Sequence, residues 1–137
     1  LQSHAFPRMP CVRESLARLN AVGLRKGVVT GARMFAIAAT LRSHAMAPEF
    51  EVVVSADEVV HSKPAPDCYL LALQQMGLQA SEAVAFEDTE HGVASAIAAG
   101  VACVAIPTPM SAAQDFSAAT VVVLDMAAAV DWVLKRG

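Results

Sequence analysis

Short apolar runs alternate along this chain with segments of helical periodicity, and this alternation restricts the fold more than any other feature of the sequence. The runs lie at residues 27–30, 51–55, 83–86, 101–106 and 120–124. They are rich in Val and Ile and lack a polar residue at every second position, which is typical of strands buried on both faces. We therefore predict an α/β fold: a Rossmann-like parallel sheet with helices on both faces.

The segments between these runs carry the spacing and the end signals of helices. Helical spacing of apolar residues is found at residues 12–19, 34–41, 69–76, 93–97 and 126–134. Pro66 fits the first helical position before residues 69–76, since its missing N–H has no partner there anyway. Gly77 fits the position just after that helix, where a left-handed conformation is common. Strand and helix patterns thus alternate along the chain, and only the last two predicted strands, 101–106 and 120–124, follow each other directly.

Composition excludes several classes of protein. With 137 residues the chain is expected to form a single domain, 1–137. Its net charge is −3 and its ten Lys and Arg are scattered, so no nucleic-acid partner is expected. Cys11, Cys68 and Cys103 are far apart and form no Cys-x-x-Cys, which argues against a disulfide framework or a zinc site. No apolar run is long enough to cross a membrane, and no signal pattern begins the chain, so we expect a cytoplasmic protein.

Polar side chains follow three of the predicted strands at their carboxyl ends. Thr30 closes the first strand, Lys63 lies in the loop after the second, and Glu87 and Asp88 close the third. In an open parallel sheet, ligands bind beyond the carboxyl ends of the strands. We expect these four side chains to converge on one site at this edge.

Thr30 and Lys63 each allow two interpretations. The Thr30 hydroxyl, followed by Gly31, can hold a phosphate oxygen together with backbone N–H groups, or it can simply cap a turn before the next helix. Lys63 can supply a positive charge to a phosphate, or it can be a solvated lysine beside a rigid Pro-x-Pro turn. Taken alone, neither residue decides between these alternatives.

Adjacent carboxylates at the end of a buried strand are a sharper signal. Glu87 and Asp88 repel each other, and a cation would relieve that repulsion; hard oxygen ligands with room for water suit Mg²⁺. The alternative is a helix start, because acidic residues favour helix N-termini. His61 and His91 are interpreted as surface or loop residues rather than acid–base groups.

Together these pieces resemble the haloacid dehalogenase superfamily, in particular β-phosphoglucomutase and its sugar-phosphate phosphatase relatives. The resemblance covers nearly the whole chain, and the order of the segments matches. Those segments are Pro10-Cys11-Val12-Arg13-Glu14, Gly27-Val28-Val29-Thr30-Gly31, Val54-Ser55-Ala56-Asp57, Lys63-Pro64-Ala65-Pro66-Asp67 and Phe86-Glu87-Asp88-Thr89, followed by Gly92-Val93 and Ala99-Gly100.

The resemblance implies a role for each candidate residue. Thr30, with Gly31, would bind the transferring phosphoryl group, and Lys63 would stabilise its charge. Glu87 and Asp88 would hold Mg²⁺. The substrate would be a small phosphorylated metabolite.

One part of the family's pattern is missing from this sequence. The first motif, an Asp-x-Asp whose first aspartate attacks phosphorus, occurs nowhere in the chain. The resemblance therefore implies the C-terminal part of a core domain, without the first motif and the cap domain, and inactive on its own. A degenerate, non-catalytic module that binds a partner or a phosphorylated ligand is the alternative. A response-regulator-like domain fits less well, because its first strand should end in acidic residues rather than Thr30.

The missing motif also has a consequence for assembly. In the resembled fold, its strand lies between the strand that ends at Thr30 and the strand that ends at Glu87. Without it, both strands have an unpaired edge, and unpaired edges favour pairing with another chain. We expect either direct pairing of the two strands or a homodimer formed through these edges. The third outcome is a partly unfolded chain that aggregates.

Overall fold

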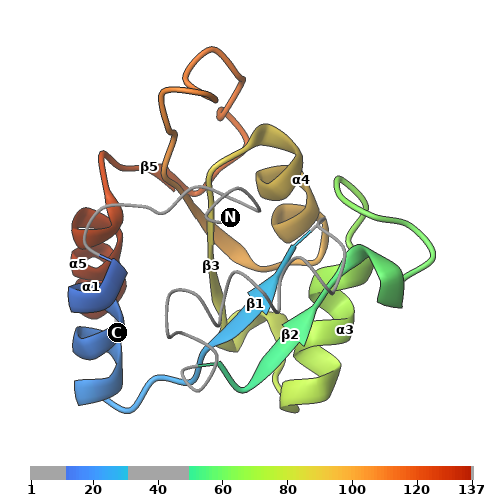
Figure 1. Ribbon diagram of the computed structural model, residues 1–137, viewed down its shortest axis with the longest axis horizontal. Coiled ribbons are helices and arrows are strands. Elements are labelled where there is room, and N and C mark those ends of the chain that lie inside the picture. The colour runs from blue at the N-terminus through green and yellow to red at the C-terminus, as the bar shows by residue number, and fades with distance from the viewer. Residues whose placement is uncertain (1–11, 31–49, 137) are drawn as a thin grey trace, which may run out of the picture.

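The computed structural model describes residues 12–30 and 50–136 of the chain, which fold into strands and helices (Figure 1). Short 3-10 turns lie at Ala56–Glu58 and Ala80–Glu82. The strands are β1 (Gly27–Val29), β2 (Val52–Val54), β3 (Val84–Glu87), β4 (Ala102–Ala105) and β5 (Val121–Val122). The helices are α1 (Val12–Ala21), α3 (Asp67–Met76), α4 (Glu90–Ala98) and α5 (Met126–Arg136).

All strand pairs are parallel, but the strands form two sheets rather than one within the described residues. β1 pairs with β2, with Val28 opposite Val53. β3, β4 and β5 form the other sheet in that order, with Phe86 opposite Val104. The predicted α/β class is confirmed. Direct pairing of β1 with β3, one of the outcomes expected from the sequence, does not occur among the described residues.

Helices cover both faces of the β3–β4 pair, as the uninterrupted apolar runs predicted (Figure 1). Alternate residues of each strand point to opposite faces. One set packs with α3 and α4, and the other packs with α5, which itself lies against α1. The buried members of the first set are Ala85, Cys103 and Ala105, and they lie in one core cluster with Cys68, Tyr69, Ala72, Val93 and Ala96 from the two helices. Those of the second are Val104 and Ile106, with Ala129 from α5.

Some ends of helices and strands in the structure differ from the predicted ones. Pro66 is the N-cap of α3 rather than its first helical residue, while Gly77 ends the helix with φ of 68°, as expected. The run at 120–124 forms only the two-residue strand β5, because this strand is paired on one side alone and Leu124 is 87 % exposed. The predicted helix at residues 34–41 lies outside the described residues. No helix of the described part is long and apolar enough to cross a membrane.

Candidate active site

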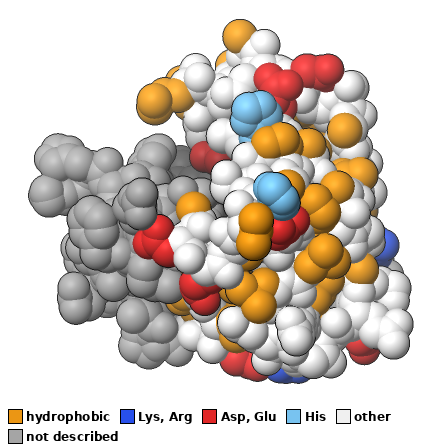
Figure 2. Space-filling model, turned by 90° about the vertical axis from the view of Figure 1, so that its right-hand side faces the viewer, with side chains coloured by type: hydrophobic (Ala, Val, Ile, Leu, Met, Phe, Trp, Pro, Cys, Tyr) orange, Lys and Arg blue, Asp and Glu red, His pale blue; other side chains and the backbone are white. Residues whose placement is uncertain are grey.

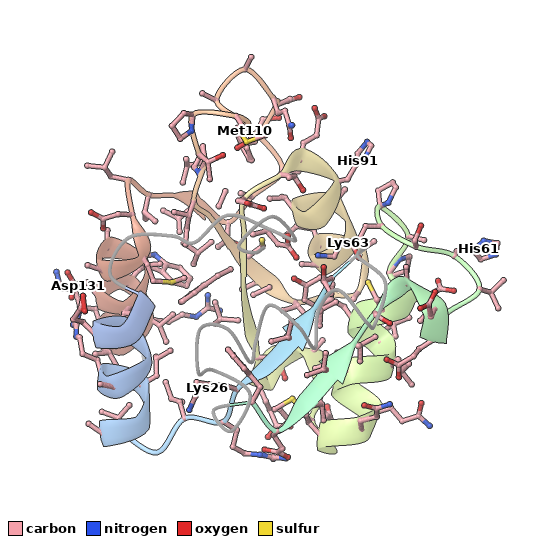
Figure 3. All side chains as sticks on the ribbon, viewed as in Figure 1. Lys26, His61, Lys63, His91, Met110 and Asp131 are labelled. Carbon is pink, nitrogen blue, oxygen red and sulfur yellow. The ribbon has the colours of Figure 1, made fainter. Side chains whose placement is uncertain are left out.

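Lys63 is the centre of a buried polar cluster at the carboxyl ends of β1 and β3. Its loop follows β2 and runs into α3, and its side chain points inward (Figure 3). The Nζ atom donates to the carbonyl oxygen of Val29 at 3.0 Å and to Oε2 of Glu87 at 2.6 Å. The side chains of Lys63 and Glu87 are only 14 % and 7 % exposed. The ammonium group therefore connects the last residues of two strands from different sheets.

Glu87 is enclosed on both sides of its carboxylate. The Tyr69 hydroxyl, from the first turn of α3, donates to the same Oε2 atom that accepts from Lys63. The other oxygen, Oε1, lies against the backbone of Gly92, where a Cβ atom would approach it to 1.9 Å. A residue without a side chain at position 92 is thus required for this orientation of Glu87. Neither Tyr69 nor Gly92 was singled out from the sequence as a site residue.

The buried cluster changes the acid–base properties of its neighbours. Burial, and then the charge of Glu87, raise the pKa of Tyr69 well above its usual value, so the phenol stays neutral and keeps donating. Burial also raises the pKa of the Cys103 thiol to about 12, with a further contribution from Glu87. Both groups therefore remain uncharged at neutral pH.

A second buried group fixes the lysine loop itself. Ser95 of α4, fully buried, donates its hydroxyl to the carbonyl oxygen of Ala65 at 2.7 Å. The Sγ atom of Cys68 lies 3.6 Å from the same hydroxyl. Because Ala65 is two residues from Lys63, this contact holds the loop on α4. Sequence periodicity placed Ser95 only as a helix residue, and no signal in the sequence identified its loop contact.

Glu87 and Asp88, the predicted metal ligands, have different surroundings in the structure. Glu87 is engaged by Lys63 and Tyr69, whereas Asp88 follows it half-buried at the entrance to α4. Thr89 caps α4 by accepting from the N–H of Gly92 at 3.1 Å. Among residues 12–30 and 50–136, no group of three His, Cys, Asp or Glu side chains is arranged to hold a metal ion. The metal role of Glu87 and Asp88 stays a prediction.

Thr30 lies beside the cluster, and the histidines lie away from it. The half-buried Thr30 donates its backbone N–H to Val54 at 3.0 Å, directly after the Val29 carbonyl that Lys63 contacts. Gly31 lies outside the described residues.

His61 and His91 are exposed and point outward, in agreement with their interpretation as surface residues (Figure 3). Histidine and hydrophobic side chains, with carboxylates between them, are spread over the face shown in Figure 2.

Comparison with known proteins gives the family. A model of the haloacid dehalogenase-like hydrolases matches residues 2–106. Protein CbbY of Rhodobacter capsulatus is 42 % identical over 124 residues, which is 88 % of this chain and 55 % of that protein. Hexitol phosphatase A of Escherichia coli is 35 % identical over 108 residues, covering 79 % of this chain and 50 % of the relative. The chain thus spans about half the length of these curated relatives.

Solved structures agree with this assignment. The crystal structure of CbbY from Rhodobacter sphaeroides in complex with phosphate superposes with a TM-score of 0.81 at 29 % identity, over 87 % of this chain and 54 % of that one. A second crystal structure, of a mutant of that protein, holds xylulose-1,5-bisphosphate. The ordered motifs, the parallel α/β architecture and the matching family model lead to one conclusion: this chain belongs to the haloacid dehalogenase-like hydrolases.

Proposed function

We propose that this chain is the C-terminal part of a core domain that catalyses Mg²⁺-dependent phosphoryl transfer from a small phosphorylated sugar. The observation that carries the proposal is the buried Lys63 ammonium, held between the carboxyl ends of β1 and β3 by Val29 and Glu87. A buried, paired lysine at this edge of a parallel sheet is costly for stability and is expected at a functional site.

The roles of the individual residues follow from the donors that they present. An ammonium group has three N–H donors, and two of those of Lys63 are used by described residues, which leaves one for a phosphoryl oxygen. Thr30 is proposed to bind the same group through its hydroxyl, since its own N–H donates to Val54, and Gly31 is proposed to bind it through its backbone N–H. A fixed positive charge that contacts the phosphoryl oxygens stabilises the charge that develops during transfer.

The metal is proposed to bind at Asp88 and Glu87. These carboxylates fit part of a Mg²⁺ site, because Mg²⁺ keeps several waters and binds through one or two carboxylates. Glu87 would contribute its Oε1 atom, since Oε2 accepts from Lys63 and Tyr69. When bound, the ion would neutralise phosphate charge. Since the described residues offer no third carboxylate at this place, we expect weak binding by the chain alone. Titration calorimetry in millimolar Mg²⁺ tests this, and micromolar affinity would contradict it.

The nucleophile is proposed to come from outside this sequence. The chain has no Asp-x-Asp, and Glu87 is already engaged by Lys63 and Tyr69. We therefore expect the purified chain to lack useful phosphatase activity, because loss of a nucleophile costs several orders of magnitude in such systems. Robust Mg²⁺-dependent hydrolysis of a generic phosphate ester by the chain alone would refute this expectation.

A chimera provides the positive test. An Asp-x-Asp-bearing N-terminal segment of a family member is joined to this chain, and the product is assayed with xylulose-1,5-bisphosphate, a hexitol phosphate and a generic ester. These sugars are chosen because relatives hold or are named for them. We expect hydrolysis that is lost in a Lys63→Met variant of the chimera. Retention of activity in that variant would contradict the role of Lys63.

The second candidate is a non-catalytic module that binds a phosphorylated ligand. It is favoured by the same missing Asp-x-Asp, and it predicts that a sugar phosphate stabilises the chain without being hydrolysed, even in the chimera. Thermal unfolding of the chain with the same sugar phosphates shows whether they bind, and the assay of the chimera then separates the two candidates: binding without hydrolysis favours the module.

Assembly and location complete the proposal. β1 and β3 each have one edge that no described strand pairs, and we propose that a homodimer forms through these edges. Size-exclusion chromatography with light scattering tests it, and a monomer at all concentrations would contradict it.

Cys68 and Cys103 are free thiols and buried, consistent with a proposed cytoplasmic location.

A further inference from the structure

Tyr69 is the only tyrosine of the chain, and its position connects the lysine loop with the carboxylate. It lies in the first turn of α3, three residues after Pro66, and is 8 % exposed. Its hydroxyl donates to Oε2 of Glu87, and its ring centroid lies 5.5 Å from Nζ of Lys63. One side chain thus contacts both members of the buried ion pair.

The two donors converge on a single oxygen. Oε2 of Glu87 accepts from Lys63 and from Tyr69, while Oε1 is held against the backbone of Gly92. A carboxylate with only one donor could rotate about its last bond and carry the flexible lysine with it. The rigid phenol removes that freedom, since it has two rotatable bonds and its ring is packed in the core.

We propose that Tyr69 is a positioning residue: its hydroxyl fixes the carboxylate of Glu87, and through it the direction in which the Lys63 ammonium faces the substrate. The proposal deepens the phosphoryl-transfer function and rests on it for the catalytic consequence. Tyr69 itself touches no reacting atom; its effect reaches the reaction through Lys63. A tyrosine that merely fills the core, with its hydroxyl satisfied, would have no effect on the ammonium.

The first test needs no activity. The chain has three lysines, Lys26, Lys63 and Lys135, so a spectrum of lysine ¹⁵Nζ groups is simple to assign. We expect a protected Lys63 ammonium signal in the wild-type chain. In Tyr69→Phe, which keeps the ring and removes the hydroxyl, we expect proton exchange at Lys63 to quicken about tenfold, the effect of losing one hydrogen bond to a charged group.

A matched control separates positioning from general loosening. Ala72→Gly lies one turn further along α3, is buried like Tyr69, and weakens the helix while leaving the hydrogen bonds of Glu87 and Lys63 in place. At equal loss of thermal stability, only Tyr69→Phe should change the Lys63 signal. Unchanged exchange in a folded Tyr69→Phe variant, or the same change in Ala72→Gly, would overturn the proposal.

The second test uses the active chimera. A misdirected lysine weakens transition-state stabilisation more than ground-state binding, so Tyr69→Phe should lower kcat about tenfold and leave KM nearly unchanged. A faster-exchanging ammonium with unchanged kcat would overturn the catalytic part of the proposal. If the wild-type chimera is inactive, the proposed function fails, and the exchange comparison still decides whether Tyr69 holds Lys63.

Discussion

Two ion pairs at opposite ends of the β1–β2 sheet have contrasting surroundings. At the amino end, Arg25 donates through Nε to Glu51 at 2.8 Å, and through Nη2 to the other oxygen of Glu51 and to the carbonyl of Met76. The side chains of Arg25 and Glu51 are 46 % and 41 % exposed. At the carboxyl end, Lys63 and Glu87 are 14 % and 7 % exposed. The first pair is solvated, and the second is enclosed by protein.

This difference in burial distinguishes an ion pair with only a structural role from one that is a candidate for a functional role. Exposed pairs contribute little to stability, because water and salt screen them. A buried pair carries a desolvation cost that packed apolar residues would avoid, so stability alone does not explain it. The pair at the carboxyl edge is the one that lies where ligands bind in parallel sheets. The following experiments test how far this contrast extends.

The largest effect is expected for Lys63→Met. This change leaves the buried Glu87 without its cation and should reduce the free energy of unfolding by about 3–5 kcal/mol, as breaking a buried pair does. Urea denaturation measures it. The double variant Lys63→Met, Glu87→Gln should recover much of the loss, because no unpaired charge remains. Equal stability of the single and double variants would contradict a buried, coupled pair.

Gly92→Ala should be the next most harmful change. Alanine normally favours a helix interior over glycine, but here its Cβ would lie 1.9 Å from Oε1 of Glu87. Displacement of the carboxylate should cost about 1–3 kcal/mol, the usual range for overpacking. In the background of Glu87→Ala, where the atoms that clash are absent, Gly92→Ala should be neutral or stabilising. Destabilisation in both backgrounds would show that the clash has another origin.

Alkaline pH should act through Tyr69. Its pKa is raised in the folded state, so the neutral phenol contributes stability that is fully present below about pH 10 and is lost as pH rises through the folded pKa. Because the chain has one tyrosine, tyrosinate absorbance reports this group alone. We expect ionisation to coincide with loss of the fold measured by circular dichroism. Tyrosinate formation near pH 10 with the fold intact would disagree with the buried hydroxyl.

Arg25→Ala should have the smallest effect. The hydrogen bond from Arg25 lowers the pKa of Glu51, so the contribution of this pair is present above pH 4.5 and is lost as pH falls through the folded pKa of Glu51. We expect only a slight decrease in melting temperature, smaller at high salt. Arg18→Ala, which breaks the exposed pair with Asp131, is the control and should behave alike. A loss comparable with that of Lys63→Met would remove the contrast between the two pairs.

The sequence predicts the strands and the edge that carries the site, because these depend on local patterns. Uninterrupted apolar runs identified β1 to β4, and the position of Lys63 and Glu87 after strands placed them at one edge. Tyr69 was missed because helical periodicity counts it as an apolar face residue. The partner of its hydroxyl is 18 positions away in sequence, and only tertiary packing brings it there.

The engagement of Glu87 was also beyond sequence reasoning. The two adjacent carboxylates suggested that both bind one cation. In the structure, however, one carboxylate belongs to the end of a strand and the other to the approach to a helix, so the two side chains have different surroundings. Glu87 is the last residue of β3 and is buried, whereas Asp88 precedes the cap residue of α4. The sequence likewise did not predict that the described strands divide into two sheets. Which strands pair depends on how the helices and loops place them in space, and local sequence patterns do not show this.

The division into two sheets has a consequence for how the fold opens. β1 and β2 have three residues each, and a two-stranded unit of this size is marginal without support from its surroundings. β3 and β4, covered by helices on both faces, are expected to belong to the larger cooperative unit. We expect amides of β1 and β2 to lose their protection at lower free energy than those of β3 and β4. Lys63 spans the boundary between the units, so the candidate site exists only while the smaller unit is docked on the larger one.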